Sequence, residues 1–470
     1  MSKITELFND TCQTNAKKDA IYFYDNALQM RTYENLNADI NSCINYLNSK
    51  GIKTGDRVFI FAPASYRLTV FMIAAFKLGI QVMFLDINAR QETFRKLFNR
   101  FQPKYVLISN KTKFFRIFFS SVFKIRNVLN LDKIKPNPTA PEQLPEISDT
   151  TPALLTTTTG STGLPKIVVR SHQDLYNQLE LIDKNLPKSS RSTILSTSYI
   201  YTFAILARGD AAILPQINLS WPAEKINQRL QHFADIPITI IITSPVFGLK
   251  ANNVFPELKQ LYIGGASISL QEAETIAQKF PDSRVYIVYG ATECNIMART
   301  TLANYMKELR ENYRSTLGRP FDGVSLQIAE DESIIVSCNA LIKGFINEKS
   351  EYATREGDWY NTNDKGYIKD GVLYYRGKYN YFVTLGDAKY YNHELEQFLS
   401  VKFPDYKKCA VVQKRNKIYL FGTEREHERE LVDALHKKYG IDVQFRHIKQ
   451  IPHDVRHHTK TDYKQLLAQI

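Results

Sequence analysis

The sequence predicts an α/β fold in which helices cover the faces of parallel sheets. Apolar runs of strand length at 57–61, 81–85 and 105–108 alternate with a helical pattern at 65–78 and a polar helical segment that ends at Phe101. The same alternation returns through 238–243, 261–266 and 286–289. Strands that alternate with helices are typical of a doubly wound parallel sheet. The 470 residues are enough for two domains.

The segments between these elements add a hairpin and a linker. Residues 20–35 alternate apolar and polar types around Asp25 and Asn26, which predicts a hairpin with its turn at this pair. The proline-rich stretch 136–151 predicts a linker that leads into an apolar run at 152–155.

Composition limits the class of protein. The formal net charge of +13 favours anionic partners such as nucleotides, coenzyme A, anionic lipid or nucleic acid, and charge alone does not choose among them. The five cysteines are scattered and form no C-x-x-C pair, so we expect neither a disulfide framework nor a zinc site. Residues 1–6 lack the apolar core of a signal peptide, and Lys77 and Gly79 interrupt the most apolar window, 68–87. We therefore expect a cytoplasmic protein.

A loop at 156–166 carries the strongest chemical signal. It holds six hydroxyl side chains, two glycines and one lysine between two apolar runs. Glycine lets backbone N–H groups approach a ligand closely, while hydroxyls and a lysine suit phosphate oxygens. A Walker loop is excluded by the spacing and by the strand that follows. The expected polyphosphate-binding residues are Thr158, Thr159, Gly160, Ser161, Thr162, Gly163 and Lys166.

A second signal lies at 289–293, directly after the apolar run 285–288. Glu293 follows a hydroxyl, Thr292, and a glycine turn at Gly290. A carboxylate in this position could hold Mg²⁺ against a nucleotide phosphate. An exposed glutamate with a structural role is the alternative.

Residues 159–166 closely resemble the phosphate loop of the ANL superfamily of adenylate-forming enzymes, and 289–293 resemble its second signature. The resemblance covers the whole chain, with the remaining motifs degraded but in the right order. It implies a large multi-layer α/β N-terminal AMP-binding domain at 1–379 and a small mobile α/β C-terminal domain at 380–470. It also implies ATP and Mg²⁺ as cofactors, coenzyme A as the expected acceptor, and no nucleic acid partner.

The resemblance implies a role for each matched position. Thr292 would contact phosphate, Glu293 would bind the metal, and Lys460 would reach both the carboxylate and the α-phosphate. Asp364 would accept the ribose hydroxyls, although Asn363 replaces the family's glycine and Lys378 replaces its arginine. Asn380 would be the hinge. The expected adenine- and ribose-binding residues are Gly265, Ala266, Tyr289, Gly290, Asp364 and Lys378.

The resemblance also places an acid-binding pocket without charged residues. Its expected residues are His172, Tyr201, Phe203, Val246, Phe247 and Gly264. The Phe-Asp motif of amino-acid-specific members is missing near Tyr201, which favours a fatty or aryl acid over an amino acid. The expected reaction is ATP-dependent formation of an acyl-adenylate and transfer to coenzyme A. Transfer to a carrier protein, β-lactone closure, and a nucleotide-binding relative without catalysis remain as alternatives.

The stretch 111–126 combines five basic residues, five phenylalanines and no acid. On a helix, Phe115, Phe119 and Phe123 share one face. The functional interpretation is weak, peripheral contact with an anionic membrane. The alternative is a helix packed on the core with solvated basic flanks.

Overall fold

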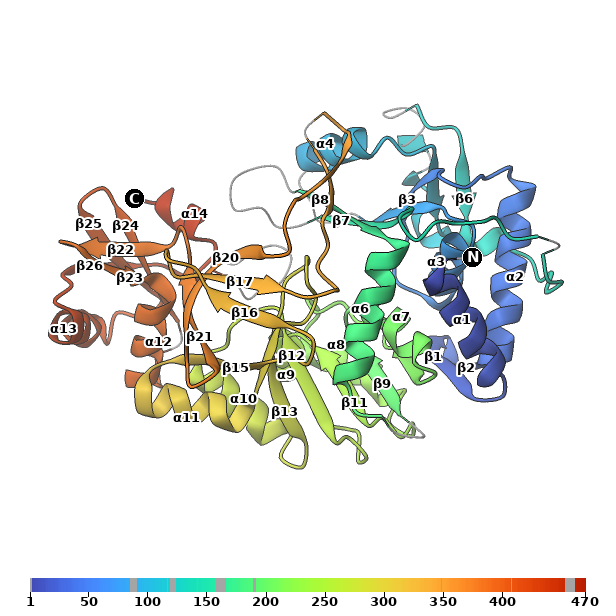
Figure 1. Cartoon of the computed structure of the whole chain (residues 1–470). Helices are drawn as coiled ribbons and strands as arrows, with labels where there is room; N and C mark the ends of the chain where they lie inside the picture. Colours follow the sequence, from blue (N-terminus) through green and yellow to red (C-terminus); the bar gives the residue numbers. More distant parts are fainter. Residues whose placement is uncertain are drawn as a thin grey trace.

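The computed structural model describes residues 2–84, 91–115, 117–118, 124–141, 143–157, 166–188, 192–347, 349–406, 408–452 and 461–470. Most of the phosphate loop and Lys460 lie outside these ranges. Two large sheets, separated and covered by helices, form the greater part of the molecule, and a smaller α/β unit follows at the C-terminus (Figure 1).

An eight-stranded sheet has the order β19-β18-β8-β7-β4-β3-β5-β6. Its strands β7, β4, β3, β5 and β6 are parallel, while β7–β8, β8–β18 and β18–β19 pair antiparallel. The strands are β3 (Arg57–Phe61), β4 (Gln81–Phe84), β5 (Tyr105–Ile108), β6 (Val128–Asn130), β7 (Pro152–Thr157), β8 (Ile167–Ser171), β18 (Gly344–Ile346) and β19 (Tyr352–Thr354).

A thirteen-stranded sheet has the order β16-β17-β20-β21-β15-β14-β13-β12-β11-β9-β10-β1-β2. Its strands from β13 to β1 in this order are parallel, so β9, β11, β12 and β13 end at one edge. The strands are β1 (Asp19–Asp25), β2 (Ala27–Thr32), β9 (Thr193–Ser196), β10 (Ala211–Leu214), β11 (Ile240–Thr243), β12 (Gln260–Gly264), β13 (Arg284–Tyr289), β14 (Ala298–Thr301), β15 (Ser315–Pro320), β16 (Ser325–Ile328), β17 (Ser333–Ser337), β20 (Tyr360–Lys369) and β21 (Val372–Lys378).

Helices fill three layers around these sheets. The inner layer is α1 (Lys3–Thr14), α2 (Tyr33–Ser49), α3 (Tyr66–Lys77), α6 (His172–Asn185) and α7 (Tyr199–Ala207). Helix α4 (Gln91–Phe101) covers the outer face of the eight-stranded sheet. The outer face of the thirteen-stranded sheet carries α8 (Ala223–Gln231), α9 (Pro245–Lys250), α10 (Leu270–Lys279) and α11 (Leu302–Asn312).

The alternation of strand side chains explains these layers. In β3, Val58 and Ile60 join the inner apolar cluster, whereas Phe59 and Phe61 pack with α4 on the other face. Helix α3 is almost entirely apolar, and all of its residues except Arg67 are buried between the sheets. Among the described residues, no helix is long and apolar enough to cross a membrane.

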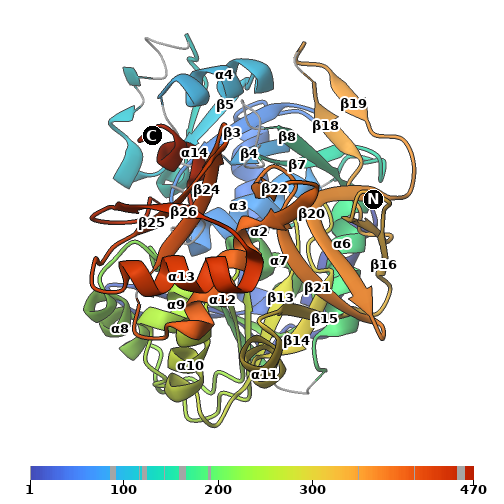
Figure 2. The ribbon, with the colours of Figure 1, turned by 90° about the vertical axis from the view of Figure 1, so that its left-hand side faces the viewer.

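The C-terminal unit has its own apolar cluster. Its elements are β22 (Phe382–Leu385), β23 (Ala388–Tyr391), α12 (Asn392–Lys402), β24 (Cys409–Lys414), β25 (Lys417–Gly422), α13 (Glu428–Tyr439), β26 (Val443–His447) and α14 (Tyr463–Leu467). Helix α12 packs beside α10 and α11 (Figure 2), and Gln397 Nε2 donates to the carbonyl of Ile268 at 2.9 Å. The expected domain boundary at 379/380 falls between β21 and β22.

The predicted α/β class is confirmed, and the strands predicted at 57–61 and 105–108 coincide with β3 and β5. The predicted hairpin is shorter than expected. Asn26 adopts a left-handed backbone at its turn (φ 59°), but β2 ends at Thr32, whose hydroxyl caps α2 by accepting from Asn35 N–H. The Thr-x-x-Asn capping pattern therefore stops the hairpin before residue 35.

Candidate active site

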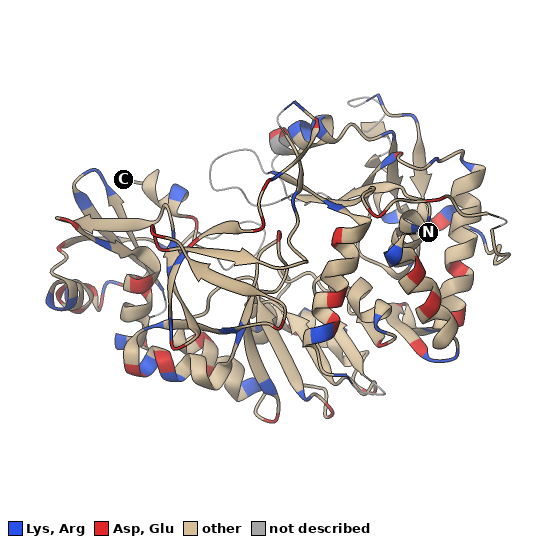
Figure 3. Ribbon diagram, viewed as in Figure 1, with Lys and Arg blue, Asp and Glu red and all other residues tan. Residues whose placement is uncertain are grey.

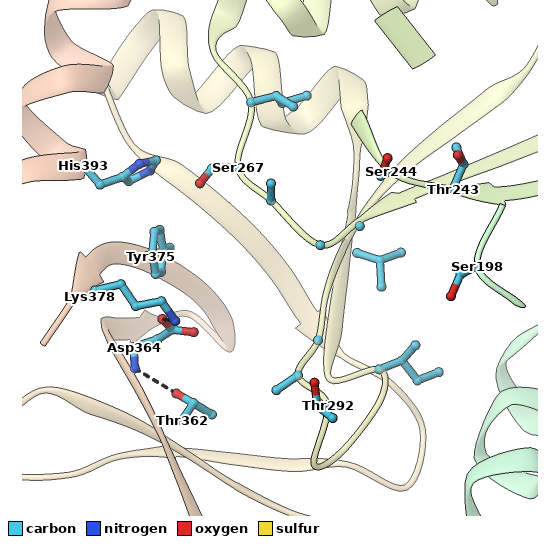
Figure 4. Close-up of a pocket in the computed structure, with 18 of the residues that line it drawn as sticks. Ser198, Thr243, Ser244, Ser267, Thr292, Thr362, Asp364, Tyr375, Lys378 and His393 are labelled. Carbon is cyan, nitrogen blue, oxygen red and sulfur yellow. Dashed lines mark hydrogen bonds and ion pairs between the residues drawn. The ribbon is translucent and has the colours of Figure 1, made fainter. Parts of the chain in front are cut away.

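A cavity of about 1420 Å³ lies where β9, β11, β12 and β13 end. Thr243 and Ser244 lie on one side of it, while Asp364, Lys378 and His393 lie on the other (Figure 4). The carboxyl edge of parallel strands is the usual ligand-binding place in open α/β sheets. Residues 461–464 also line the cavity, so the large sheets and the C-terminal unit both contribute walls.

The loop after β13 is a tight turn that only this sequence allows. A Cβ on Gly290 would lie 1.9 Å from the carbonyl oxygen of Asn295, so this position requires glycine. The Ala291 carbonyl accepts from Cys294 N–H at 3.2 Å and from Asn295 N–H at 2.7 Å, and Asn295 has a left-handed backbone (φ 72°). The turn brings Thr292 and Glu293 to the cavity wall.

Three neighbours surround Glu293. Ile342 N–H donates to its carbonyl oxygen at 2.7 Å. The hydroxyl of Tyr360 hydrogen-bonds with its carboxylate, and burial together with this charge raises the pKa of Tyr360. The third neighbour is Lys166, whose ammonium group lies 4.3 Å from the centre of the Phe345 ring. Burial lowers the pKa of Lys166, and the negative charge of Glu293 opposes that shift.

This chemistry fits a magnesium ion that is bound together with a nucleotide. Mg²⁺ commonly takes one or two protein carboxylates and completes its octahedral shell with phosphates and water. Within the described ranges, no cluster of three or more His, Cys, Asp and Glu side chains could form an all-protein cage. Glu293 would hold the ion, which would neutralise phosphate charge.

A second group of polar residues forms the opposite end. Asp364 Oδ2 accepts from the hydroxyl of Tyr289 at 2.8 Å, and Lys378 Nζ forms an ion pair with Asp364 Oδ1. Asp364 N–H donates to Thr362 Oγ1 at 3.2 Å (Figure 4). Asn363 has a left-handed backbone (φ 58°), so the turn is kept although the expected glycine is absent.

Most of the expected nucleotide residues that the structure describes meet at this cavity. Those on its wall are Lys166, Gly265, Ala266, Gly290, Thr292, Glu293, Asp364, Lys378 and Asn380. Tyr289, expected to bind adenine or ribose, does not line the cavity. Its hydroxyl donates to Asp364 Oδ2, so it positions that carboxylate. Thr158, Thr159, Gly160, Ser161, Thr162, Gly163 and Lys460 lie outside the described residues.

The expected acid pocket needs correction. Tyr201 and Gly264 line the cavity, and the Tyr201 hydroxyl donates to Asn295 Oδ1 at 2.7 Å. The other four expected residues do not line it. The His172 Nδ1 atom forms a hydrogen bond with Ser2 Oγ at 2.7 Å, and burial lowers the pKa of His172 to about 4. The ring of Phe203 packs against that of Phe76. Val246 and Phe247 are buried in α9 on the outer face of the sheet, and neither lines the cavity.

Other apolar side chains line the cavity. They include Ile182, Leu186, Ile200, Ile242, Val288, Ile296 and Phe321. Hydroxyls also line this region: Thr197, Ser198, Thr243 and Ser244, which follow or end β9 and β11. Their position after apolar strand runs is the sequence signal that could have identified them.

Arg170 is a site residue that sequence reasoning missed. Its side chain is buried, with Nη1 donating to Thr156 Oγ1 at 2.6 Å and Nη2 donating to the carbonyl of Thr292 at 2.9 Å. It therefore joins the strand that enters the phosphate loop to the loop that carries Glu293. Its own position after three apolar residues of β8 predicts only a strand residue.

We predict that Arg170→Lys lowers the rate of adenylate formation roughly tenfold or more, because one ammonium group cannot replace a planar fork that spans two acceptors. The measurement is kcat and KM for MgATP, with circular dichroism to verify folding. Arg310→Lys, on an exposed arginine, is the matched control. Equal rates for both variants would contradict the positioning role.

Glu396 of α12 is a second missed residue. It lines the cavity, and burial raises its pKa to about 8, although Val411 N–H (3.0 Å) and the Tyr463 hydroxyl (2.8 Å) donate to it. The bond to Tyr463 ties the segment that follows Lys460 to α12. His393, on the same helix, bonds Ser315 Oγ at 2.8 Å, and burial lowers its pKa to about 4.

We predict that Glu396 makes the stability of the protein fall as the pH rises. The folded carboxyl titrates near 8 and the unfolded one near 4.5, so the folded state binds the extra proton between these values. The free energy of unfolding should therefore decrease across this window. Glu396→Gln should flatten the dependence and unfold a few degrees higher than the native chain at about pH 9, as thermal scans would measure. Glu426→Gln, on an exposed side chain, should keep the native slope; an unchanged slope in Glu396→Gln would refute the assignment.

Fold and site together define an adenylate-forming ligase. A model of the AMP-binding enzyme family matches residues 8–339, and the chain therefore belongs to this family. The D-alanine--D-alanyl carrier protein ligase of Staphylococcus haemolyticus is 23% identical over 505 aligned positions and covers 100% of both chains.

Solved structures share the fold. The o-succinylbenzoate CoA synthetase of Bacillus subtilis has a TM-score of 0.80 at 19% identity, covering 98% of this chain and 97% of that one. A fatty acyl CoA synthetase of Mycobacterium tuberculosis has a TM-score of 0.75 at 17% identity, covering 99% and 98%. These are structures of the ANL superfamily, and the predicted resemblance is confirmed.

Proposed function

We propose that the protein activates a carboxylic acid with ATP and then passes the acyl group to the thiol of a carrier protein. In the first step a carboxylate oxygen attacks the α-phosphorus, pyrophosphate leaves and an acyl-adenylate remains. In the second step a thiol sulfur attacks the acyl carbon and AMP leaves. We also propose that the units 1–379 and 380–470 turn about Asn380 between these steps.

The observation that carries this proposal is the meeting of two polar groups in one cavity. Lys166, Thr292 and Glu293 are suited to phosphates and Mg²⁺, and the Asp364–Lys378 pair lies opposite them. The chain needs no covalent chemistry in the first step. It supplies placement and neutralising charge, which are large terms in phosphate transfer.

The acceptor differs from the one first expected. Coenzyme A has no support from the names of the curated relatives, which specify a carrier protein; one of these relatives aligns over the full length of this chain. The carrier-protein alternative is therefore the better supported one, and we propose it here.

For the acid, we propose a carboxylic acid with an uncharged tail. Carboxylates that line the cavity each have another role or partner: Glu272 caps α10, Glu293 faces Lys166, Asp364 pairs with Lys378, Glu396 accepts from Tyr463, and Asp462 caps α14. Beside Tyr201 the described wall is apolar or carries uncharged polar groups, namely hydroxyls and the amide of Asn295, whose Oδ1 accepts from Tyr201. A fatty or aryl acid suits such a wall better than the ammonium group of an amino acid, which needs a counter-charge.

The test measures acid-dependent exchange of pyrophosphate into ATP with octanoate, benzoate and D-alanine. We expect exchange with octanoate or benzoate, and transfer of that acid to a phosphopantetheine-loaded carrier protein faster than to coenzyme A. Preference for D-alanine would overturn the proposed acid, and faster transfer to coenzyme A would overturn the acceptor. Nucleotide binding without exchange for any acid would leave the non-catalytic alternative.

Weak contact with an anionic membrane is a further proposal for 111–126. Phe114 and Ile117 are 76% and 75% exposed, beside Lys111 and Lys113, while Phe118 packs on the core under α4. In the view of Figure 3, basic and acidic positions are interspersed along the ribbon. Phe119 and Phe123 lie outside the described residues.

We predict that the chain sediments with vesicles that contain anionic lipid at low salt and that Phe114→Ser with Ile117→Ser weakens this binding severalfold, because both side chains could enter the headgroup boundary. Leu28→Ser with Met30→Ser, on side chains each 40% exposed, is the control. If high salt abolishes the binding and the double substitution does not weaken it, the attraction is purely electrostatic and no apolar side chain enters the membrane.

A further inference from the structure

Two cysteines meet directly behind the proposed metal-binding loop. Cys294 Sγ and Cys338 Sγ lie 3.1 Å apart, and both are free thiols. Cys294 is fully buried, whereas Cys338 is partly exposed and can be reached from solvent. A disulfide bond is about 2.05 Å long, so the sulfurs need to close by only ~1 Å to become linked.

The position of the pair gives the contact a functional consequence. Cys294 follows Glu293 in the chain. Cys338 begins the segment whose Ile342 N–H donates to the Glu293 carbonyl, and Ala340 and Leu341 of this segment are buried. A covalent link would therefore join the Glu293 loop to a well-packed segment that already holds it.

We propose that Cys294 and Cys338 form a reversible oxidation site that lowers the activity of the enzyme. A peroxide is the oxidant: the Cys338 sulfur attacks one peroxide oxygen, the O–O bond breaks, and a sulfenic acid and water form. The Cys294 sulfur then attacks the Cys338 sulfur, the S–O bond breaks and a second water leaves. Two thiols and one hydrogen peroxide thus give one disulfide and two waters, and a dithiol reverses the change.

Loss of activity follows from the movement of the sulfurs. Closing ~1 Å at Cys294 displaces its neighbour Glu293, and misplacement of that size at a reacting centre can cost ~100-fold in rate. The activity part of the inference rests on the proposed function. The chemical part, disulfide formation, does not.

The experiment treats the full chain with hydrogen peroxide, quenches it, and maps the thiols by alkylation and peptide mass spectrometry. We expect a Cys294–Cys338 linked peptide, a mass loss of about 2 Da, and at least a ~10-fold fall in pyrophosphate exchange that dithiothreitol restores. Cys338→Ala should be insensitive to peroxide, and Cys294→Ala should stop at a sulfenic acid. Mapping of the native chain decides the linkage even if a variant does not fold.

Three results would overturn the inference: no linked peptide, a sulfinic acid on Cys338 in place of the link, or a linked protein with unchanged activity. If no acid supports exchange, the proposed function fails, and binding of a fluorescent ATP analogue before and after oxidation becomes the readout. A linked protein with unchanged nucleotide binding would then also reject the functional part.

Discussion

Glu293→Gln should lower the rate of adenylate formation by at least ~100-fold, the scale of losing one charge partner in the transition state. The amide has the shape of the carboxylate but no charge with which to hold Mg²⁺ beside the phosphates. The fold should survive, since the Glu293 carbonyl keeps its bond from Ile342 N–H. The measurement is pyrophosphate exchange as a function of Mg²⁺ concentration.

Glu356→Gln is the matched control, because that side chain is exposed and does not line the cavity. In Glu293→Gln, additional Mg²⁺ should restore the rate of pyrophosphate exchange only in part. The affinity of the variant for metal-free nucleotide should equal that of the native protein. A Glu293→Gln enzyme with the native rate at saturating Mg²⁺ would show that this carboxylate is structural.

Local periodicity was enough to predict the α/β class, since β3, β5, β11 and β12 are short apolar runs bounded by helical patterns. It could not predict that thirteen strands form one sheet. The order from β16 to β2 depends on antiparallel partners far apart in sequence, such as β15 with β21 and β17 with β20. Such pairings are set by tertiary contacts, which leave no local pattern.

The residues of the candidate site likewise fall into those that the sequence led us to expect and those that it did not. Thr292, Glu293 and Asp364 were expected because each lies in a short motif that resembles a signature of the ANL superfamily, and all three line the cavity. Arg170 and Glu396 were not, because their partners are distant: Arg170 reaches Thr292, and Glu396 accepts from Tyr463.

Four of the six residues expected in the acid pocket do not line the cavity, and for two of them the reason is geometric. Phe203 and Phe247 have the right chemistry, but the faces of α7 and α9 that carry them point into the core. An apolar helix without polar positions gives no sequence signal for which face meets a cavity. The structure places Ile200 and Tyr201 of α7 there instead.

Lys460→Ala should reduce adenylate formation by roughly two orders of magnitude, while transfer of the acyl group from added acyl-adenylate should suffer much less. Lys460 itself lies outside the described residues. The residues that follow it, Thr461 to Lys464, line the cavity, and Tyr463 is held there by Glu396. We expect Lys460, which directly precedes these residues in the sequence, to bridge the acid's carboxylate and the α-phosphate, two groups that react with each other only in the first step.

The two half-reactions are measured separately, by pyrophosphate exchange for the first and by thioester formation from synthetic acyl-adenylate for the second. Lys449→Ala, on an exposed lysine of the same unit, is the control and should leave both rates unchanged. Loss of both half-reactions to the same extent would contradict the bridging role, since the attacking carboxylate has lost its charge once the acyl-adenylate has formed. Loss of neither would show that Lys460 takes no part in the reaction.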